Sequence, residues 1–291
     1  MSFSIHEGEV LGLVGESGCG KSTTGMTLLN LYPPTSGEIH FNGIGRIDTA
    51  DSATLLKFRR RAQIVFQNPY EALNPRYTVE QSVREPITIH FGGDAAAMRE
   101  RVIRAMLRAG LTPPETYLTR YPHQLSGGQL QRVAIARAIA IEPRFLVADE
   151  PVSMLDISIR AGILNLLRSF ATDLKMAVLY ISHDLSTMRH ISTRIAVMYL
   201  GRIVEIGPAG DILDRPQHPY AQALIAAIPV MGVRAKRRRT RLAGTIPSAT
   251  AIPSGCPFHP RCPQALPRCA HEPPTLKKVV EDRLVACHLY D

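Results

Sequence analysis

Residues 10–22 read VLGLVGESGCGKS, and this segment gives the first indication of the fold. Its first five residues, Val10–Val14, form a short apolar run that ends at a glycine, which predicts a buried β-strand. The next eight, Gly15 to Ser22, match the phosphate-loop pattern GxxxxGK(S/T). A helix is expected over residues 21–31. The loop therefore lies between a strand and a helix N-terminus, where backbone N–H groups can surround a phosphate.

This pattern predicts a nucleotide-binding loop in which two side chains have defined roles. Lys21 can reach the β- and γ-phosphates, and the Ser22 hydroxyl can bind Mg²⁺. A glycine-rich turn before a core helix would not account for the adjacent lysine and serine. The residues expected to contact the nucleotide are Gly15, Glu16, Ser17, Gly18, Cys19, Gly20, Lys21, Ser22 and Thr23.

A second apolar run, Phe145–Ala148, ends in the acids Asp149 and Glu150. In parallel sheets, ligands bind at the carboxyl ends of the strands, where these acids would lie. Beside a phosphate loop, Asp149 is expected to hold Mg²⁺ through water and Glu150 to polarise the attacking water as a general base. Without the phosphate loop, a solvated acidic turn would explain the same residues equally well.

Strands and helices alternate along the chain, which predicts an α/β fold with a parallel sheet. Between residues 70 and 137 the apolar spacing is helical, which indicates an inserted helical subdomain. Past residue 208 the composition changes, so we expect a nucleotide-binding domain over 1–208 and an extension over 209–291. The predicted strands are 10–14, 38–41, 63–66, 145–148, 176–181 and 195–199, and the clearest predicted helix is 157–174.

Composition restricts the class of protein further. The 291 residues are 45% hydrophobic and 20% charged, which is typical of globular chains. The sequence contains no apolar run near the ~18–20 residues that span a bilayer, and its first residues lack the features of a signal peptide. We therefore expect a cytosolic chain whose membrane association is peripheral. The net charge of +9 suits nucleic acid, anionic lipid or phosphate ligands and does not choose among them.

The segment Leu125-Ser126-Gly127-Gly128-Gln129 resembles the signature of ABC-type ATPases. A predicted helix follows it, which places Ser126, Gly127, Gly128 and Gln129 at a second phosphate-facing helix N-terminus. The resemblance implies that this element contacts the γ-phosphate held by a partner subunit, so that ATP is bound between two ATPase subunits arranged head to tail. It also implies a P-loop NTPase of ABC type, with a RecA-like parallel-sheet core, an inserted helical subdomain and a Cys-containing C-terminal extension.

Three further residues match elements of this family. By resemblance, Gln67 senses Mg²⁺ and couples to the membrane subunits, Asp156 is the acid of the loop that crosses the dimer interface, and His183 contacts the γ-phosphate. The aromatic residue on which adenine stacks in the family would lie before Met1. This predicts that the chain is truncated or its start placed late, with Phe3 as the alternative stacking residue.

Toward the C-terminus the resemblance becomes more specific. The segments at 66–76, 197–205 and 218–229 are similar to the ATPases of dipeptide and oligopeptide importers, a branch that also includes nickel importers, and the cysteine-containing tail resembles the C-terminal extension of that branch. This implies three kinds of partner: a second ATPase subunit, identical or not, two transmembrane permease subunits and, indirectly, an extracytoplasmic solute-binding protein. It also implies a location on the cytoplasmic side of the inner membrane.

Four of the five cysteines, Cys256, Cys262, Cys269 and Cys287, lie in a proline-rich stretch with little apolar sequence. Such a segment needs a cross-link or a metal, and the resemblance implies a [4Fe–4S] cluster on the four thiolates. Zinc on the same cysteines is the alternative, and unligated thiols are a third. The basic run at 234–241 is expected to be a solvated linker, or alternatively to contact anionic lipid headgroups.

Two other functions compete with that of an importer ATPase. A soluble ABC-type protein acting on DNA or ribosomes would usually carry a coiled-coil insertion or two tandem cassettes. This chain has one cassette and a modest helical insert, so nucleic acid is not an expected partner. A nucleotide-binding regulator that hydrolyses ATP poorly is disfavoured by the presence of both Glu150 and His183.

Overall fold

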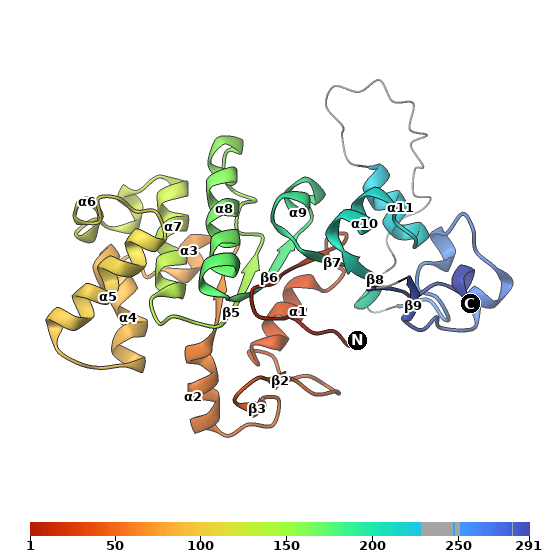
Figure 1. The fold of residues 1–291 in the computed structure, drawn as a ribbon, viewed down its shortest axis with the longest axis horizontal. Helices are drawn as coiled ribbons and strands as arrows, with labels where there is room; N and C mark the ends of the chain where they lie inside the picture. The colour runs from red at the N-terminus through yellow and green to blue at the C-terminus, as the bar shows by residue number, and fades with distance from the viewer. Residues whose placement is uncertain (228–246, 248–250, 281) are drawn as a thin grey trace. The chain divides into compact units, whose positions relative to one another are not determined.

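The computed structural model describes residues 1–227, 247, 251–280 and 282–291 (Figure 1). The chain divides into two compact units. The first, which we call the phosphate-loop unit, comprises Met1–Ser4, Val10–Lys21 and Ile181–Asp291. The second, the signature unit, comprises Ile5–Glu9 and Ser22–Tyr180. The basic run at 234–241 lies outside the described residues.

The phosphate-loop unit contains one parallel pair of strands, and three antiparallel strands extend the sheet from this pair. β1 (Val10–Val14) pairs in parallel with β7 (Arg194–Tyr199), and all of β1 is buried, as its apolar sequence predicts. A tight turn at Leu200-Gly201, with positive φ angles of 42° and 75°, leads into the antiparallel strands. These strands are, in spatial order, β8 (Arg202–Pro208), β10 (Arg283–Val285) and β9 (Lys277–Val280). The alternation of strands and helices did not predict this antiparallel continuation.

Short helices complete the phosphate-loop unit. Asp184 caps the helix that follows His183. The proline-rich extension forms mainly single turns rather than long helices, because proline cannot donate the interior hydrogen bonds of a helix. The elements are α9 (Leu185–Ile191), α10 (Ala209–Asp214), α11 (Pro219–Ala226), and the 3-10 turns η2 (His259–Arg261), η3 (Pro267–Ala270) and η4 (His288–Tyr290).

In the signature unit, the strand that ends in the paired acids is fully buried. This strand, β5 (Phe145–Asp149), pairs in parallel with β4 (Ala62–Val65), and β6 (Ala177–Ser182) follows β5 in the sheet. The predicted strands at 63–66, 145–148 and 176–181 are confirmed to within a residue at each end. The remaining elements outside the helical insertion are α1 (Lys21–Leu28), the hairpin of β2 (His40–Phe41) and β3 (Gly45–Arg46), α2 (Ser52–Arg61) and α8 (Ile157–Leu174).

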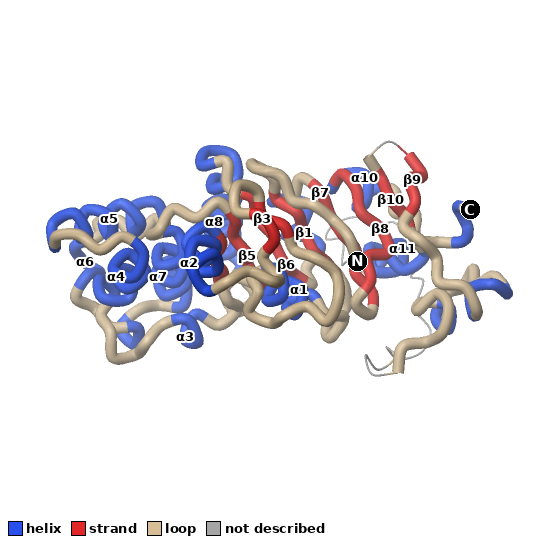
Figure 2. The backbone as a smooth tube through the Cα atoms, turned by 90° about the horizontal axis from the view of Figure 1, so that it is seen from below, coloured by secondary structure: helices blue, strands red, loops and turns tan. Residues whose placement is uncertain are grey.

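Helices predominate between residues 69 and 139, as the apolar spacing predicts, and they gather in one group in Figure 2. Thr78 and Asp94 cap two of them, and the last helix packs against both. The elements are α3 (Pro69–Ala72), α4 (Val79–His90), α5 (Ala95–Arg108), α6 (Glu115–Leu118), η1 (Pro122–Gln124) and α7 (Gly127–Ile139). Throughout the described part of the chain, every helix is too short or too polar to cross a membrane.

Candidate nucleotide-binding site

The phosphate loop runs from the end of β1 to the start of α1, and three of its glycines are required by geometry. Gly18 and Gly20 have left-handed φ angles of 79° and 102°, which would strain a residue that carries a Cβ. Gly15 is required for a different reason, because a Cβ there would lie 2.2 Å from the carbonyl oxygen of Met198. The backbone can therefore follow this path only with glycine at these positions.

The ammonium group of Lys21 lies inside the loop. Its side chain is buried, and Nζ donates hydrogen bonds to the carbonyl oxygens of Gly15 at 2.9 Å and Glu16 at 3.0 Å. A positive charge is therefore held where the pattern requires one for phosphate binding. Cys19 is also buried, and burial raises the pKa of its thiol, so this residue is a neutral spacer in the loop rather than a nucleophile.

Two contacts that were not predicted from the sequence hold the loop from outside. The N–H of Gly201, in the β7–β8 turn, donates to the carbonyl oxygen of Cys19 at 2.8 Å. The N–H of Glu16 donates to the hydroxyl oxygen of Tyr220 at 2.9 Å. Tyr220 belongs to the segment His218-Pro219-Tyr220, which by itself indicates only a resemblance to peptide importers. Nothing in the local sequence around Tyr220 indicates a contact with residue 16.

Oxygen ligands suitable for Mg²⁺ meet at the start of α1. The Ser22 hydroxyl donates to a carboxylate oxygen of Asp149 at 3.1 Å, so the two residues expected to hold Mg²⁺ lie beside each other. Ser22 and Thr23 are exposed, whereas Asp149 is buried at the end of β5. Mg²⁺ prefers hard oxygen ligands such as this hydroxyl and carboxylate, so these residues fit the expected ion.

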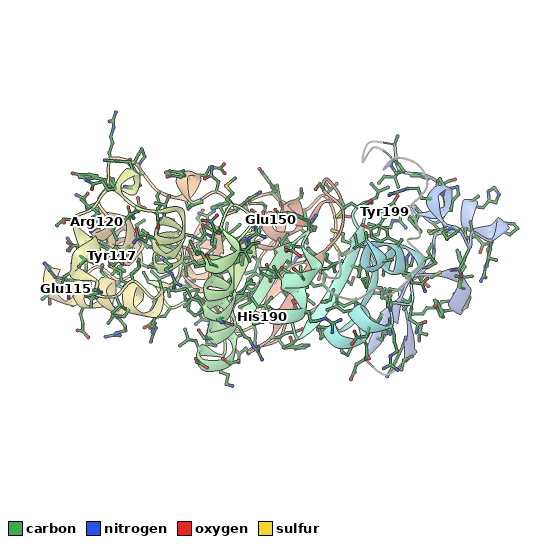
Figure 3. All side chains as sticks on the ribbon, turned by 90° about the horizontal axis from the view of Figure 1, so that it is seen from above. Glu115, Tyr117, Arg120, Glu150, His190 and Tyr199 are labelled. Atoms are coloured by element: carbon green, nitrogen blue, oxygen red, sulfur yellow. The ribbon has the colours of Figure 1, made fainter. Side chains whose placement is uncertain are left out.

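Glu150 adopts a conformation that non-glycine residues rarely occupy. Its φ is +46°, and its backbone carbonyl accepts hydrogen bonds from the N–H and hydroxyl of Ser153, at 3.1 Å and 3.0 Å. Backbone strain of this kind is concentrated at functional sites, where the surrounding structure maintains it. The side chain is half-buried just beyond β5, where Figure 3 labels it.

The signature segment forms the N-terminus of α7. Ser126 is the N-cap, and it exchanges two hydrogen bonds with Gln129 in a capping box. Ser126 and Gly127 are exposed, so this helix N-terminus is accessible to a ligand. Gly128 instead faces the interior, where a Cβ would lie 2.7 Å from a methyl carbon of Ile159.

The three remaining predicted site residues are all exposed beyond the ends of strands or at helix starts. Gln67 lies two residues past β4, His183 directly follows β6, and Asp156 is the N-cap residue of α8. The residues on either side of Asp156 present apolar surface to solvent, since Met154 is 63% exposed and Ile157 is 83% exposed.

All five cysteines, each within the described residues, are free thiols. Burial raises the pKa of Cys287 to about 11, with a further contribution from the neighbouring thiols of Cys256, Cys262 and Cys269. Among the residues that the structure describes, no three His, Cys, Asp or Glu side chains form a group that could hold a metal ion. The iron–sulfur and zinc predictions therefore find no support in this arrangement.

Comparison with known sequences matches both parts of the chain. The family "ABC transporter" matches residues 1–153, and "Oligopeptide/dipeptide transporter, C-terminal region" matches residues 204–269. The oligopeptide transport ATP-binding protein AppF of Bacillus subtilis is 44% identical over 100% of this chain and 88% of its own length. The dipeptide transport ATP-binding protein DppF of Haemophilus influenzae is 43% identical over the same shares of the two chains.

Solved structures give the same result for the fold. The dimeric ABC cassette MJ0796, and its post-hydrolysis state bound to ADP and Pi, each align with a TM-score of 0.64 and 32% identity. Each alignment covers 71% of this chain and 88% of the other. The predicted ABC-type ATPase fold is thereby confirmed, and so are ATP binding and hydrolysis. This chain belongs to the ABC transporter family, as an ATP-binding protein with the oligopeptide/dipeptide transporter C-terminal region.

Proposed function

We propose that this chain is the ATP-hydrolysing subunit of an importer of dipeptides or oligopeptides. The observation that carries the proposal is the match of residues 204–269 to the oligopeptide/dipeptide transporter C-terminal region. It is supported by full-length similarity to relatives named for oligopeptide and dipeptide transport. A nickel importer of the same branch is the alternative solute assignment, and a regulator that lacks transport is the alternative function.

Hydrolysis would use the residues at the ends of β1, β5 and β6. Lys21 would bind the phosphates, and Ser22 and Asp149, the latter through water, would hold a Mg²⁺ ion that supplies positive charge beside the phosphate oxygens. Glu150 orients and deprotonates the attacking water, as a half-buried carboxylate at a strand end can do. Gln67 senses the ion, and His183 contacts the γ-phosphate.

A second ATPase subunit would complete each nucleotide site. The support is the accessible N-terminus of α7, where Ser126 and Gly127 are exposed, together with the exposed apolar side chains of Met154 and Ile157 beside Asp156. Large exposed apolar side chains that lie close together are typical of protein interfaces. The partner can be an identical subunit or a related one.

The remaining partners lie in the membrane and beyond it. Two permease subunits would form the solute path, with this ATPase bound peripherally at the cytoplasmic face of the inner membrane and a solute-binding protein acting on the other side. Gln67 and the nearby Tyr70, which is 58% exposed, provide surface for contact with a permease. We propose the domain limits 1–208 and 209–291 for the ATPase domain and the extension.

ATP turnover as a function of assembly tests the proposal. The purified chain alone should be a weak ATPase, and adding the second ATPase subunit and the permeases should raise its turnover. The matched control is the same assembly containing Glu150→Gln, which keeps the size and shape of the side chain but removes the general base. High turnover by a strict monomer, independent of protein concentration, would contradict an ATP site shared between subunits.

A further inference from the structure

An arginine from the C-terminal extension binds a side chain of the phosphate loop. The guanidinium of Arg261 forms a two-pronged ion pair with the Glu16 carboxylate, with Nη1–Oε2 at 2.8 Å and Nη2–Oε1 at 3.0 Å. The side chains are only 6% and 20% exposed. Forked arginine–carboxylate pairs are the strongest and most directional ion pairs in proteins, and burial protects this one from screening.

Two buried tyrosines strengthen the same contact. The Tyr199 hydroxyl, at the end of β7 (Figure 3), accepts a hydrogen bond from Arg261 Nη1 at 3.3 Å. The Tyr220 hydroxyl accepts from the backbone N–H of Glu16, so both the side chain and the backbone of this loop residue are held. The two rings pack with Phe258, at centroid distances of 4.7 to 5.4 Å.

Buried polar contacts fix the position of Tyr220 in turn. Glu205, fully buried in β8, pairs with Arg283 of the extension and accepts hydrogen bonds from the backbone N–H groups of Gln217 and His218. His218 Nδ1 accepts from the N–H of Tyr220 at 3.0 Å. The extension therefore supports residue 16 through two routes: directly through Arg261, and through Tyr220, which Glu205 of β8 helps to position.

The charge of Glu16 explains why such support would matter for nucleotide binding. A phosphate loop binds an anion, and a carboxylate within it opposes that binding unless it is neutralised. Arg261 supplies the neutralising charge. We propose that Arg261 and Tyr220 are positioning residues for the nucleotide, and that the affinity of the loop for MgATP depends on the extension through them. This inference rests only on ATP binding at the loop and not on the transported solute.

The test is the dissociation constant of MgATP for the full-length chain, measured by calorimetry together with thermal unfolding. The wild-type chain must bind MgATP, and its failure to do so would refute the nucleotide site itself rather than this inference. Arg261→Ala should weaken binding by roughly tenfold, about 1.4 kcal/mol, which lies within the usual range of couplings between residues of one hydrogen-bond network. The matched control is Arg268→Ala, which removes an arginine of the extension that pairs with Asp291 instead, and it should leave binding unchanged.

A second substitution separates positioning from simple loss of stability. In Glu16→Gln/Arg261→Ala the unneutralised carboxylate is gone, so MgATP affinity should return to within about threefold of wild type, about half of the tenfold effect on the free-energy scale. The melting temperature should stay low, because the contact is still broken. If Arg261→Ala fails to fold, Tyr220→Phe removes only the hydroxyl that accepts from Glu16, and it should weaken binding by about threefold, a typical value for one hydrogen bond. Wild-type affinity in Arg261→Ala or Tyr220→Phe, or a double variant that binds as weakly as the single one, would overturn the proposal.

Discussion

Acidification should destabilise the chain through the buried side chain of His218. This side chain is 1% exposed, and burial lowers its pKa from 6.5 to about 3. Its Nδ1 must stay unprotonated to accept the hydrogen bond from Tyr220. The carboxylate of Glu205 is nearby, but it is already paired with Arg283 and bonded to two backbone N–H groups. His218 is therefore neutral in the folded chain at every pH well above 3.

The sign and size of the effect follow from this lowered pKa. Below pH 6.5 the unfolded chain binds a proton at His218, whereas the folded chain does so only near pH 3. The stabilisation due to the neutral histidine is complete above pH 6.5 and is lost progressively as the pH falls. At pH 5 the difference is about 1.5 pH units, which corresponds to a loss of about 2 kcal/mol in the free energy of unfolding.

Urea denaturation at pH 7 and pH 5 measures this loss. The matched variant is His218→Asn, because asparagine can also cap α11 but does not titrate. It should be less stable than wild type at pH 7, since its smaller side chain leaves a cavity. Between pH 7 and pH 5, however, wild type should lose about 2 kcal/mol more than the variant. An equal loss in the two proteins would refute the assignment of the pH dependence to His218.

Three further predictions follow from the site and the extension. Glu150→Gln should retain ATP binding and slow hydrolysis by about 10²–10⁴-fold, whereas Lys21→Ala should weaken ATP binding itself. Single-turnover kinetics and nucleotide titration distinguish the two effects. Wild-type turnover by Glu150→Gln in the assembled complex would refute the assignment of Glu150 as the general base. Gly128→Ala should lower the free energy of unfolding by about 1–3 kcal/mol because its Cβ would meet Ile159 at 2.7 Å, while Gly127→Ala, whose nearest neighbour would be at 3.7 Å, should cost little; equal melting temperatures would contradict this. Metal analysis of protein purified without oxygen tests the iron–sulfur prediction made from the sequence, for which the described residues give no support: about four irons per chain, lost in Cys262→Ser, would restore that prediction, whereas stoichiometric zinc, or no metal, would refute it.

Local features of the site could be predicted from the sequence because their physical causes are local. The apolar run before Gly15 predicts β1 with its observed bounds, and the periodicity of residues 157–174 predicts α8 equally well. The start of α7 at the signature follows from the capping preference of Ser126.

Contacts between distant segments could not be predicted in the same way. Arg261 and Glu16 are 245 residues apart, and neither periodicity nor turn chemistry indicates that they pair. The extension was expected to have little apolar core, yet Phe258 is buried against Tyr199 and Tyr220. This packing gives the extension an anchor that does not depend on a metal, and single-sequence patterns do not reveal it because the tyrosines lie outside the proline-rich stretch.

We propose that this chain couples ATP hydrolysis to the import of peptides. The most direct measurement is the ATP turnover of the complete transporter in liposomes, with its solute-binding protein loaded with a dipeptide or oligopeptide, with Ni²⁺, or left empty. Peptide-loaded protein should raise turnover above the empty state, and the increase should vanish when the chain carries Glu150→Gln. Stimulation by Ni²⁺ and not by peptides, or turnover that ignores the binding protein altogether, would contradict the peptide assignment.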